Sequence, residues 1–104
     1  MAGWTEDEIQ AVWEKGYTTQ YNEDKHRKDE KGAWISRDEY GNREHDEGWE
    51  IDHIQAKANG GTDNLSNLRP LHWKNNVLKG KGRLKDANKV TSQGDGNILI
   101  GSDI

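Results

Sequence analysis

Residues 49–82 read WEIDHIQAKANGGTDNLSNLRPLHWKNNVLKGKG, and this stretch decides the fold. Apolar and polar side chains alternate over residues 49–54, as they do along a half-buried strand. The Asn-Gly-Gly sequence at 59–61 is a strong turn signal, and residues 67–71 can form a second short strand after it. Residues 72–79 predict a short helix, which the glycines that follow would end. The predicted order is therefore strand, loop, strand, helix.

Shorter signals flank this stretch on both sides. Thr5 and Glu8 stand three residues apart before apolar residues at helical spacing, and this capping-box pattern predicts a helix over residues 6–15. Residues 17–32 show no clear period and predict an irregular arm or a hairpin. Residues 97–100 follow a turn signal, so they predict either a strand or a loosely held tail.

The composition allows only a small, aromatic core. The chain has 104 residues, of which 30% are apolar, with five tryptophans and no phenylalanine. We expect one domain over 1–104, made of an N-terminal helix and arm at 1–48, a core at 49–82 and a basic extension at 83–104. The absence of cysteine excludes disulfides, thiol nucleophiles and cysteine-based zinc sites. No transmembrane run or signal peptide is recognisable, so we expect a cytoplasmic protein that does not bind membranes.

Charge is unevenly distributed along the chain. The net charge is −4, which by itself opposes binding to a polyanion. Most acidic residues precede Ile51, however, whereas residues 74–89 are strongly basic. This basic stretch is either a solvated face or, as we interpret it, a surface that follows a DNA backbone. The candidate DNA-contacting residues are Lys74, Lys79, Lys81, Arg83 and Lys85.

Five short motifs follow one another in a fixed order within residues 49–82. They are Glu50-Ile51-Asp52-His53-Ile54, Gly60-Gly61, Asn67-Leu68, Leu71-His72 and Asn76-Val77-Leu78-Lys79-Gly80. Each is common alone, but the ordered set resembles the signature of the HNH endonucleases. The resemblance implies an α+β fold of the ββα-metal type, in which two short strands and a helix surround one divalent cation. The predicted order of elements agrees with it, and the N-terminal helix and irregular arm would make the fold loop-rich.

The resemblance also implies roles for individual residues. Asp52 resembles the first metal ligand, and His53 resembles the catalytic base that activates water. Asn67 resembles the middle asparagine, which holds the loop and orients the histidine. Asn76 occupies the third signature position, usually a His or Asn metal ligand. His72 would share a helix face with Asn76, which suits a third metal ligand or a phosphate contact. The alternative is that His72 orients the hairpin or caps the helix.

The donor set favours Mg²⁺ or Mn²⁺ over Zn²⁺. The carboxylate of Asp52 and the carbonyl of Asn76 are hard oxygen ligands, and they leave positions for water and phosphate. Many HNH relatives brace this fold with a structural zinc held by cysteine pairs. Because the chain has no cysteine, we expect tryptophan packing to replace that brace.

Together these residues predict metal-assisted hydrolysis of DNA phosphodiester bonds. An imidazole titrates near neutrality, so His53 can take a proton from water. The resemblance implies products with a 5′-phosphate and a 3′-hydroxyl. We expect low sequence specificity, since no recognition helix is visible. One active site cuts one strand at a time, so we expect a monomer that nicks DNA, although a dimer would permit double-strand breaks. The alternatives are a toxin or restriction-type nuclease module controlled by a protein partner, and a non-catalytic DNA-binding or adaptor module.

Overall fold

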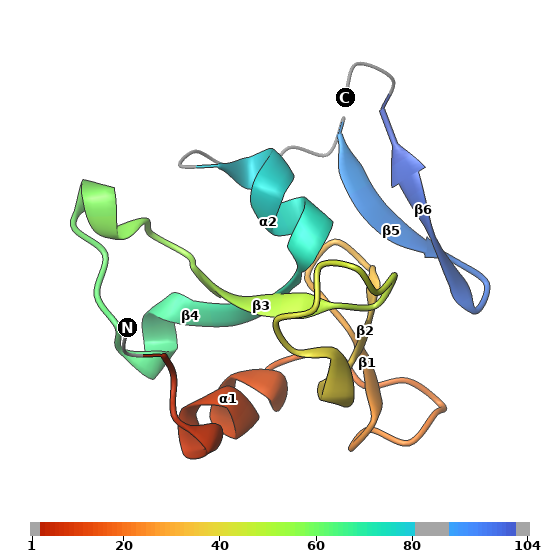
Figure 1. Cartoon of the computed structure of the whole chain (residues 1–104), viewed down its shortest axis with the longest axis horizontal. Coiled ribbons are helices and arrows are strands. Elements are labelled where there is room, and N and C mark those ends of the chain that lie inside the picture. Colours follow the sequence, from red (N-terminus) through yellow and green to blue (C-terminus); the bar gives the residue numbers. More distant parts are fainter. Residues whose placement is uncertain (1–2, 81–87, 102–104) are drawn as a thin grey trace.

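Small antiparallel sheets and two helices form the α+β fold that the sequence predicts (Figure 1). The computed structural model describes residues 3–80 and 88–101. Within these residues each sheet has two strands, which pair as β1 with β2, β3 with β4 and β5 with β6. The elements are α1 (Glu6–Trp13), β1 (His26–Lys28), β2 (Trp34–Ser36), β3 (Trp49–His53), β4 (Leu68–His72), α2 (Trp73–Lys79), β5 (Lys89–Gln93) and β6 (Gly96–Ile100).

The strands β3 and β4 and the helix α2 form the predicted unit of strand, loop, strand and helix. In the antiparallel pair, Asp52 lies opposite Arg69 and Ile51 lies opposite Pro70. Pro70 is tolerated because β4 has β3 as its partner on one edge only, among the strands that the structure describes. The turn between the strands contains Gly60 with a φ of 94°, a conformation that favours glycine. The order of elements predicted from the sequence is confirmed.

The two faces of β3 are both covered. Trp49 and Ile51 point into the core as predicted, whereas His53, on the same face, is half-buried at the edge of the core. The opposite face of β3 carries the polar residues Glu50 and Asp52. Asp52 is buried, because cationic side chains from β4 and α2 lie over it.

The N-terminal helix α1 begins where the sequence predicts. Thr5 accepts a hydrogen bond from the backbone N–H of Glu8, and the Glu8 side chain accepts one from the Thr5 N–H, which completes the capping box. The helix ends at Trp13, two residues earlier than expected. Its buried face packs against β4 and thereby helps to close the core.

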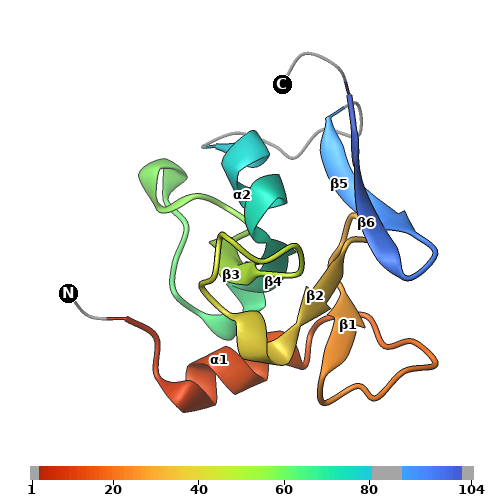
Figure 2. The same cartoon turned by 45° about the vertical axis from the view of Figure 1, so that its right-hand side comes forward.

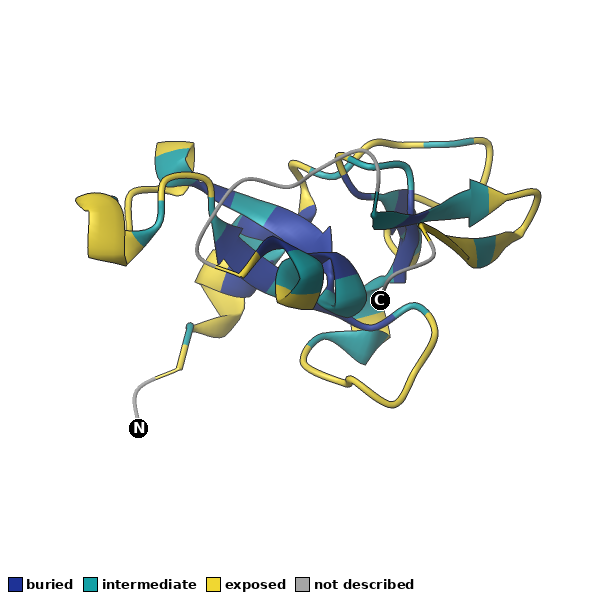
Figure 3. Ribbon diagram, turned by 90° about the horizontal axis from the view of Figure 1, so that it is seen from above, coloured by how far each residue is buried: buried dark blue, intermediate teal, exposed yellow. Residues whose placement is uncertain are grey.

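The core is built largely from aromatic rings, as the composition requires. Trp13 and Trp49 are fully buried with ring centroids 5.3 Å apart, and the Tyr40 ring meets Trp49 edge-on at 5.0 Å. Aromatic pairs in this geometry add to the stabilisation that burial gives. Trp34 is also buried and donates its indole N–H to the carbonyl of Gly94. Figure 3 shows the buried residues gathered in the centre of the molecule, with the exposed ones at the loop tips.

A buried carboxylate ties three segments of the chain together. Asp29, which is 1% exposed, accepts hydrogen bonds from the backbone N–H groups of Ala33 and His72 and from the side chain of Asn75. Asn75 also bonds to the backbone N–H and carbonyl of Val90 in β5. Figure 2 shows the result: the β5–β6 hairpin stands beside α2 and the β1–β2 hairpin. The second half of the predicted arm thus belongs to the β1–β2 hairpin, one of the two alternatives that the sequence left open. Residues 97–100 lie in β6, so they form a strand rather than a loose tail.

This network, rather than tryptophan packing alone, braces the start of α2. Tryptophan packing was expected to replace the missing zinc brace, but the Asp29 carboxylate is what joins the arm to the first turn of the helix. No helix among the described residues is long and apolar enough to cross a membrane.

Replacing Asp29 with alanine should lower the free energy of unfolding by about 3 kcal/mol or more, because several buried donors lose their acceptor at once. For a domain of this size the melting temperature should fall by roughly 12 °C or more. Thermal unfolding followed by circular dichroism measures the change. Asp24→Ala, at an exposed position in the same arm, is the matched control and should cost little. Equal stability of the two variants would contradict the bracing role of Asp29.

Candidate active site

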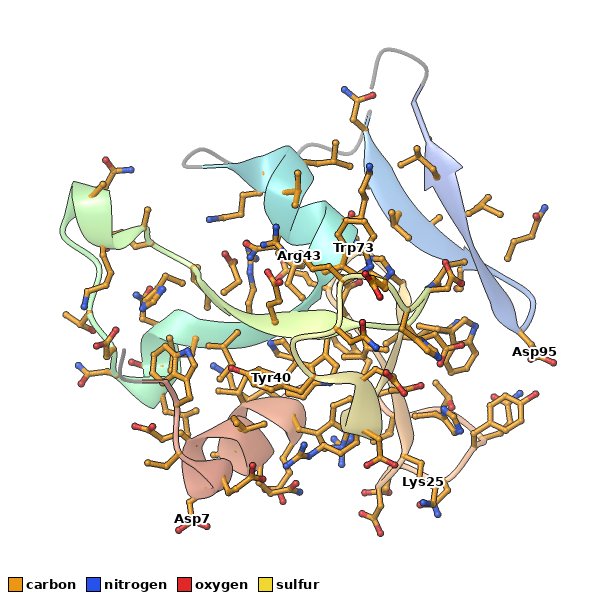
Figure 4. All side chains as sticks on the ribbon, viewed as in Figure 1. Asp7, Lys25, Tyr40, Arg43, Trp73 and Asp95 are labelled. Atoms are coloured by element: carbon orange, nitrogen blue, oxygen red, sulfur yellow. The ribbon has the colours of Figure 1, made fainter. Side chains whose placement is uncertain are left out.

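A pocket between β3, the loop that follows it and α2 gathers four of the predicted site residues. Its volume is about 340 Å³, and we call it the β3–α2 pocket. Figure 4 shows the side chains crowded between β3 and α2, with Arg43 reaching into this region from the loop before β3. The polar side chains that line the pocket are Asp52, His53, Lys57, Asn76 and Lys79.

Asp52 is buried between two cations. It is 5% exposed, and its Oδ2 accepts a hydrogen bond from Arg69 Nε at 2.7 Å while its Oδ1 lies 3.2 Å from Lys79 Nζ. Burial disfavours the charge of Arg69, but hydrogen bonds to Asp52 and Glu30 outweigh this effect and raise the pKa of the guanidinium. Each carboxylate oxygen has two acceptor positions. Asp52 therefore keeps a position for a further ligand, although two fixed cations already balance its charge.

His53 is held at one ring nitrogen by a carboxylate from the loop. Its Nε2 lies 2.7 Å from Asp63 Oδ1, and its ring packs against Trp4 with centroids 5.8 Å apart. Lys57 Nζ lies 3.3 Å from the other oxygen of Asp63. The hydrogen bonds from His53 and Lys57 hold the pKa of the Asp63 carboxyl below its ordinary value.

Asn67 fastens the loop that carries Asp63. Its Oδ1 accepts from the backbone N–H of Gln55 at 2.8 Å, and its Nδ2 donates to the carbonyls of Gln55 and Thr62. Its backbone carbonyl accepts from the N–H of Ile54. These contacts match the loop-holding role implied by the resemblance. The side chain that hydrogen-bonds to the His53 ring, however, is that of Asp63.

Asn76 is oriented by an acidic residue that the sequence analysis did not single out. Its Nδ2 donates to Glu50 Oε1 at 2.7 Å, and Arg43 donates to both oxygens of Glu50. A carboxylate only accepts hydrogen bonds, so the amide NH₂ must face Glu50, which leaves Oδ1 of Asn76 as a donor atom for a ligand. Burial opposes ionisation of Glu50, but the hydrogen bonds from Arg43 and Asn76 hold its pKa below the ordinary value.

His72 takes the capping role that the sequence left open, not a place in the pocket. It is 2% exposed, and its Nδ1 accepts from the backbone N–H of Lys74 at the start of α2. Its Nε2 lies 2.6 Å from the carbonyl of Asp46. Because both ring nitrogens are occupied, we do not retain His72 as a metal ligand or phosphate contact.

The candidate DNA-contacting lysines fall in different environments. Lys79 is 7% exposed and its ammonium faces Asp52 and the carbonyl of His53, so it does not present a free charge to a DNA backbone. Lys74 is half-buried, with its ammonium 5.5 Å from the centre of the Trp73 ring. The remaining candidates, Lys81, Arg83 and Lys85, lie outside the described residues.

Sequence reasoning missed Glu50, Asp63 and Arg69. Glu50 stands two residues before Asp52, so strand alternation places both on one face and could have marked it. Arg69 and Asp63 carried no such signal, because their contacts depend on the strand register and on the path of the loop.

The donor atoms fit a hard divalent cation better than a zinc ion. The described residues contain no group of three or more His, Cys, Asp or Glu side chains arranged to hold a metal. Asp52 and Asn76 instead offer oxygen donors from different elements to one pocket. Mg²⁺ and Mn²⁺ accept such sparse oxygen sets, since water and phosphate complete their coordination.

Comparison with known families supports the resemblance seen in the sequence. Residues 39–82 match the family described as HNH endonuclease. The match spans β3, β4, α2 and the loop between the strands, and so contains every residue of the β3–α2 pocket. Members of this family are generally endonucleases that act on nucleic acids with a divalent metal ion. Searches of the curated proteins and of the solved structures gave no match.

Asp52→Ala should lower the free energy of unfolding by about 3 kcal/mol, because it leaves two buried cations without their anion. Asp52→Asn should cost less, since the amide oxygen can still accept one hydrogen bond. Urea unfolding measures both. If Asp52→Ala unfolds at the same midpoint as the wild type, then Asp52 is not paired with Arg69 and Lys79 in solution.

Proposed function

We propose that this chain, with its HNH match, is a metal-dependent endonuclease that hydrolyses DNA phosphodiester bonds with His53 as the general base. The arm, the β3–β4–α2 unit and the C-terminal hairpin would form one nuclease domain. One observation carries the proposal: Asp52, His53 and Asn76 line a single pocket. Each is hydrogen-bonded to a charged side chain from another part of the chain. These partners are Arg69 for Asp52, Asp63 for His53 and Glu50 for Asn76.

His53 supplies the base. Its ring is half-buried against Trp4 and fixed by Asp63, so its orientation does not have to be selected when substrate arrives. A neutral imidazole takes a proton from water at near-neutral pH, and a positioned base of this kind contributes about 10²- to 10⁴-fold to a rate. The ring lines the β3–α2 pocket, where the attacked phosphate would lie.

Asp52 and Asn76 would hold the divalent cation, which we expect to be Mg²⁺ or Mn²⁺. When bound, such an ion neutralises charge on the phosphate and on the leaving oxygen. Glu50 keeps the Asn76 carbonyl turned away from itself, and Arg43 in turn fixes Glu50. These contacts keep the donor oxygen in place before any ligand binds.

Lys57 is the cation best placed to meet the phosphate. Its side chain is 60% exposed, lines the β3–α2 pocket and pairs at 3.3 Å with the exposed Asp63, whereas Lys79 is buried against Asp52. We therefore assign phosphate contact to Lys57, and to Lys79 the task of fixing α2 against the end of β3.

A single pocket of this kind cuts one strand at each encounter. A monomer would therefore nick duplex DNA, and a linear product would require a second event on the opposite strand. We expect low sequence specificity, because contacts to the DNA backbone carry no sequence information.

Wild-type protein should convert supercoiled plasmid to nicked circles in Mg²⁺ or Mn²⁺ and should be inactive in EDTA. His53→Ala should slow nicking about 100-fold or more, because the base is lost. His26→Ala, which removes a partly exposed histidine outside the β3–α2 pocket, is the matched control and should cut at the wild-type rate. Gel resolution of nicked and linear products over time measures the rates.

Two results would contradict the proposal. DNA binding without cleavage in either metal would favour a non-catalytic adaptor. Full activity of a folded His53→Ala variant would remove His53 from the base role.

A further inference from the structure

The side chain that hydrogen-bonds to the imidazole of His53 comes from the connecting loop. Asp63 lies ten residues after His53, and its Oδ1 is 2.7 Å from His53 Nε2. Its side chain is 54% exposed, so it contacts the ring from the solvent side and is not part of the core. Unlike Asn67, it makes direct contact with the imidazole.

The chemistry of the two groups fixes where the proton lies. An ionised carboxylate can only accept a hydrogen bond, so His53 Nε2 must carry the hydrogen. A neutral imidazole has one N–H, and its lone pair is then on Nδ1. Among the described residues no side chain bonds to Nδ1, and the atom is not among the buried polar atoms without a partner. No described side chain therefore competes for the lone pair of Nδ1.

The ring also separates two pockets. Asp63 and Trp4 line one of them, and we call this the Trp4 pocket. Asp52 and Asn76 line the β3–α2 pocket, and His53 lines both. Nε2 contacts Asp63, which lines the Trp4 pocket and not the β3–α2 pocket, so we infer that Nδ1 serves the pocket that holds Asp52 and Asn76.

Several contacts fix the position of the loop that carries Asp63. Asn67 Nδ2 donates to the carbonyl of Thr62, the residue before Asp63, at 2.7 Å. Gly61 comes so close to the chain that a Cβ there would lie 1.7 Å from the Gln55 carbonyl oxygen, so no larger residue fits this path. Lys57 holds the second oxygen of Asp63. Asn67 therefore acts on the histidine through the position of Asp63.

We propose that Asp63 is a positioning residue that fixes the tautomer of His53 with its proton on Nε2, so that Nδ1 takes the proton from the attacking water. This deepens the proposed function and rests on it. As the water oxygen bonds to phosphorus and the bond to the 3′ oxygen breaks, the water proton moves to Nδ1 and the 3′ oxygen takes a proton from solvent. Asp63 meanwhile faces the positive charge that the ring acquires.

The effect of Asp63 on rate is moderate because the residue is exposed. Loss of a buried carboxylate that orients a catalytic histidine can cost about 10⁴-fold. Solvent weakens an exposed pair, so we expect loss of Asp63 to lower kcat about tenfold.

The test uses the whole chain and two independent readouts. Nitrogen-15 NMR of the histidine rings, recorded without metal or DNA at a pH where the rings are neutral, reports which nitrogen of His53 carries the proton. Wild type should show the proton on Nε2, and Asp63→Ala should show a mixture of the two tautomers. Plasmid nicking should show kcat reduced about tenfold in Asp63→Ala and Asp63→Asn, with partial recovery in Asp63→Glu.

The controls separate positioning from charge and folding. Asp24→Asn changes the net charge as Asp63→Asn does but at an exposed site in the arm, and it should alter neither readout. KM should not rise in the Asp63 variants, because removal of a carboxylate does not weaken attraction to DNA. Their melting temperatures should stay near that of the wild type, since the side chain is exposed.

The outcomes distinguish this proposal from the function on which it rests. A wild-type ring with its proton on Nδ1, or a tautomer that does not change in Asp63→Ala, would overturn the proposal whether or not the protein cuts DNA. An unchanged kcat in a folded Asp63→Ala variant would also overturn it. A wild-type protein that shows the expected tautomer but no cleavage would instead defeat the nuclease function.

Discussion

The buried carboxylate of Asp29 holds the arm against the first turn of α2, and the positions of the other segments follow from this contact. A carboxylate removed from water must have its acceptor positions filled, and here the donors come from the arm, from His72 at the end of β4 and from Asn75. Asn75 also binds β5, so the same network seats the C-terminal hairpin. Asn76, the next residue along α2, is thereby fixed beside β3. In this chain, which has no cysteine, one buried acid thus braces the start of α2.

Charged partners also position the residues of the pocket. Asp52 lies between Arg69 and Lys79, His53 is held by Asp63, and Asn76 is held by Glu50. With so few apolar residues, the protein relies on these paired groups to fix side chains that a larger core would fix by packing. The arrangement carries a cost for metal binding, because the two cations beside Asp52 already balance its charge. A divalent ion would have to share this carboxylate with them.

The parts of the structure that depend on local sequence were predictable. The strand at β3, the turn at Gly60 and the capping box at Thr5 each depend on a few neighbouring residues, and each was confirmed. The contacts of Asp29 and Asp63 were not predictable, because they join residues that only the folded chain brings together. The face of β3 that carries Asp52 shows the same limit, since its burial depends on cations from β4 and α2. Glu50 could have been found from strand alternation.

The proposal that Asp52 and Asn76 hold a divalent cation can be tested by locating the bound ion. Crystals of the protein soaked in Mn²⁺ and measured at the manganese absorption edge would show the ion as an anomalous peak. If Asp52 and Asn76 are the ligands, one peak lies in the β3–α2 pocket, within bonding distance of an oxygen of Asp52 and of Asn76 Oδ1. A peak coordinated by other residues, or a pocket in which Arg69 and Lys79 keep Asp52 and no ion enters at saturating Mn²⁺, would contradict it.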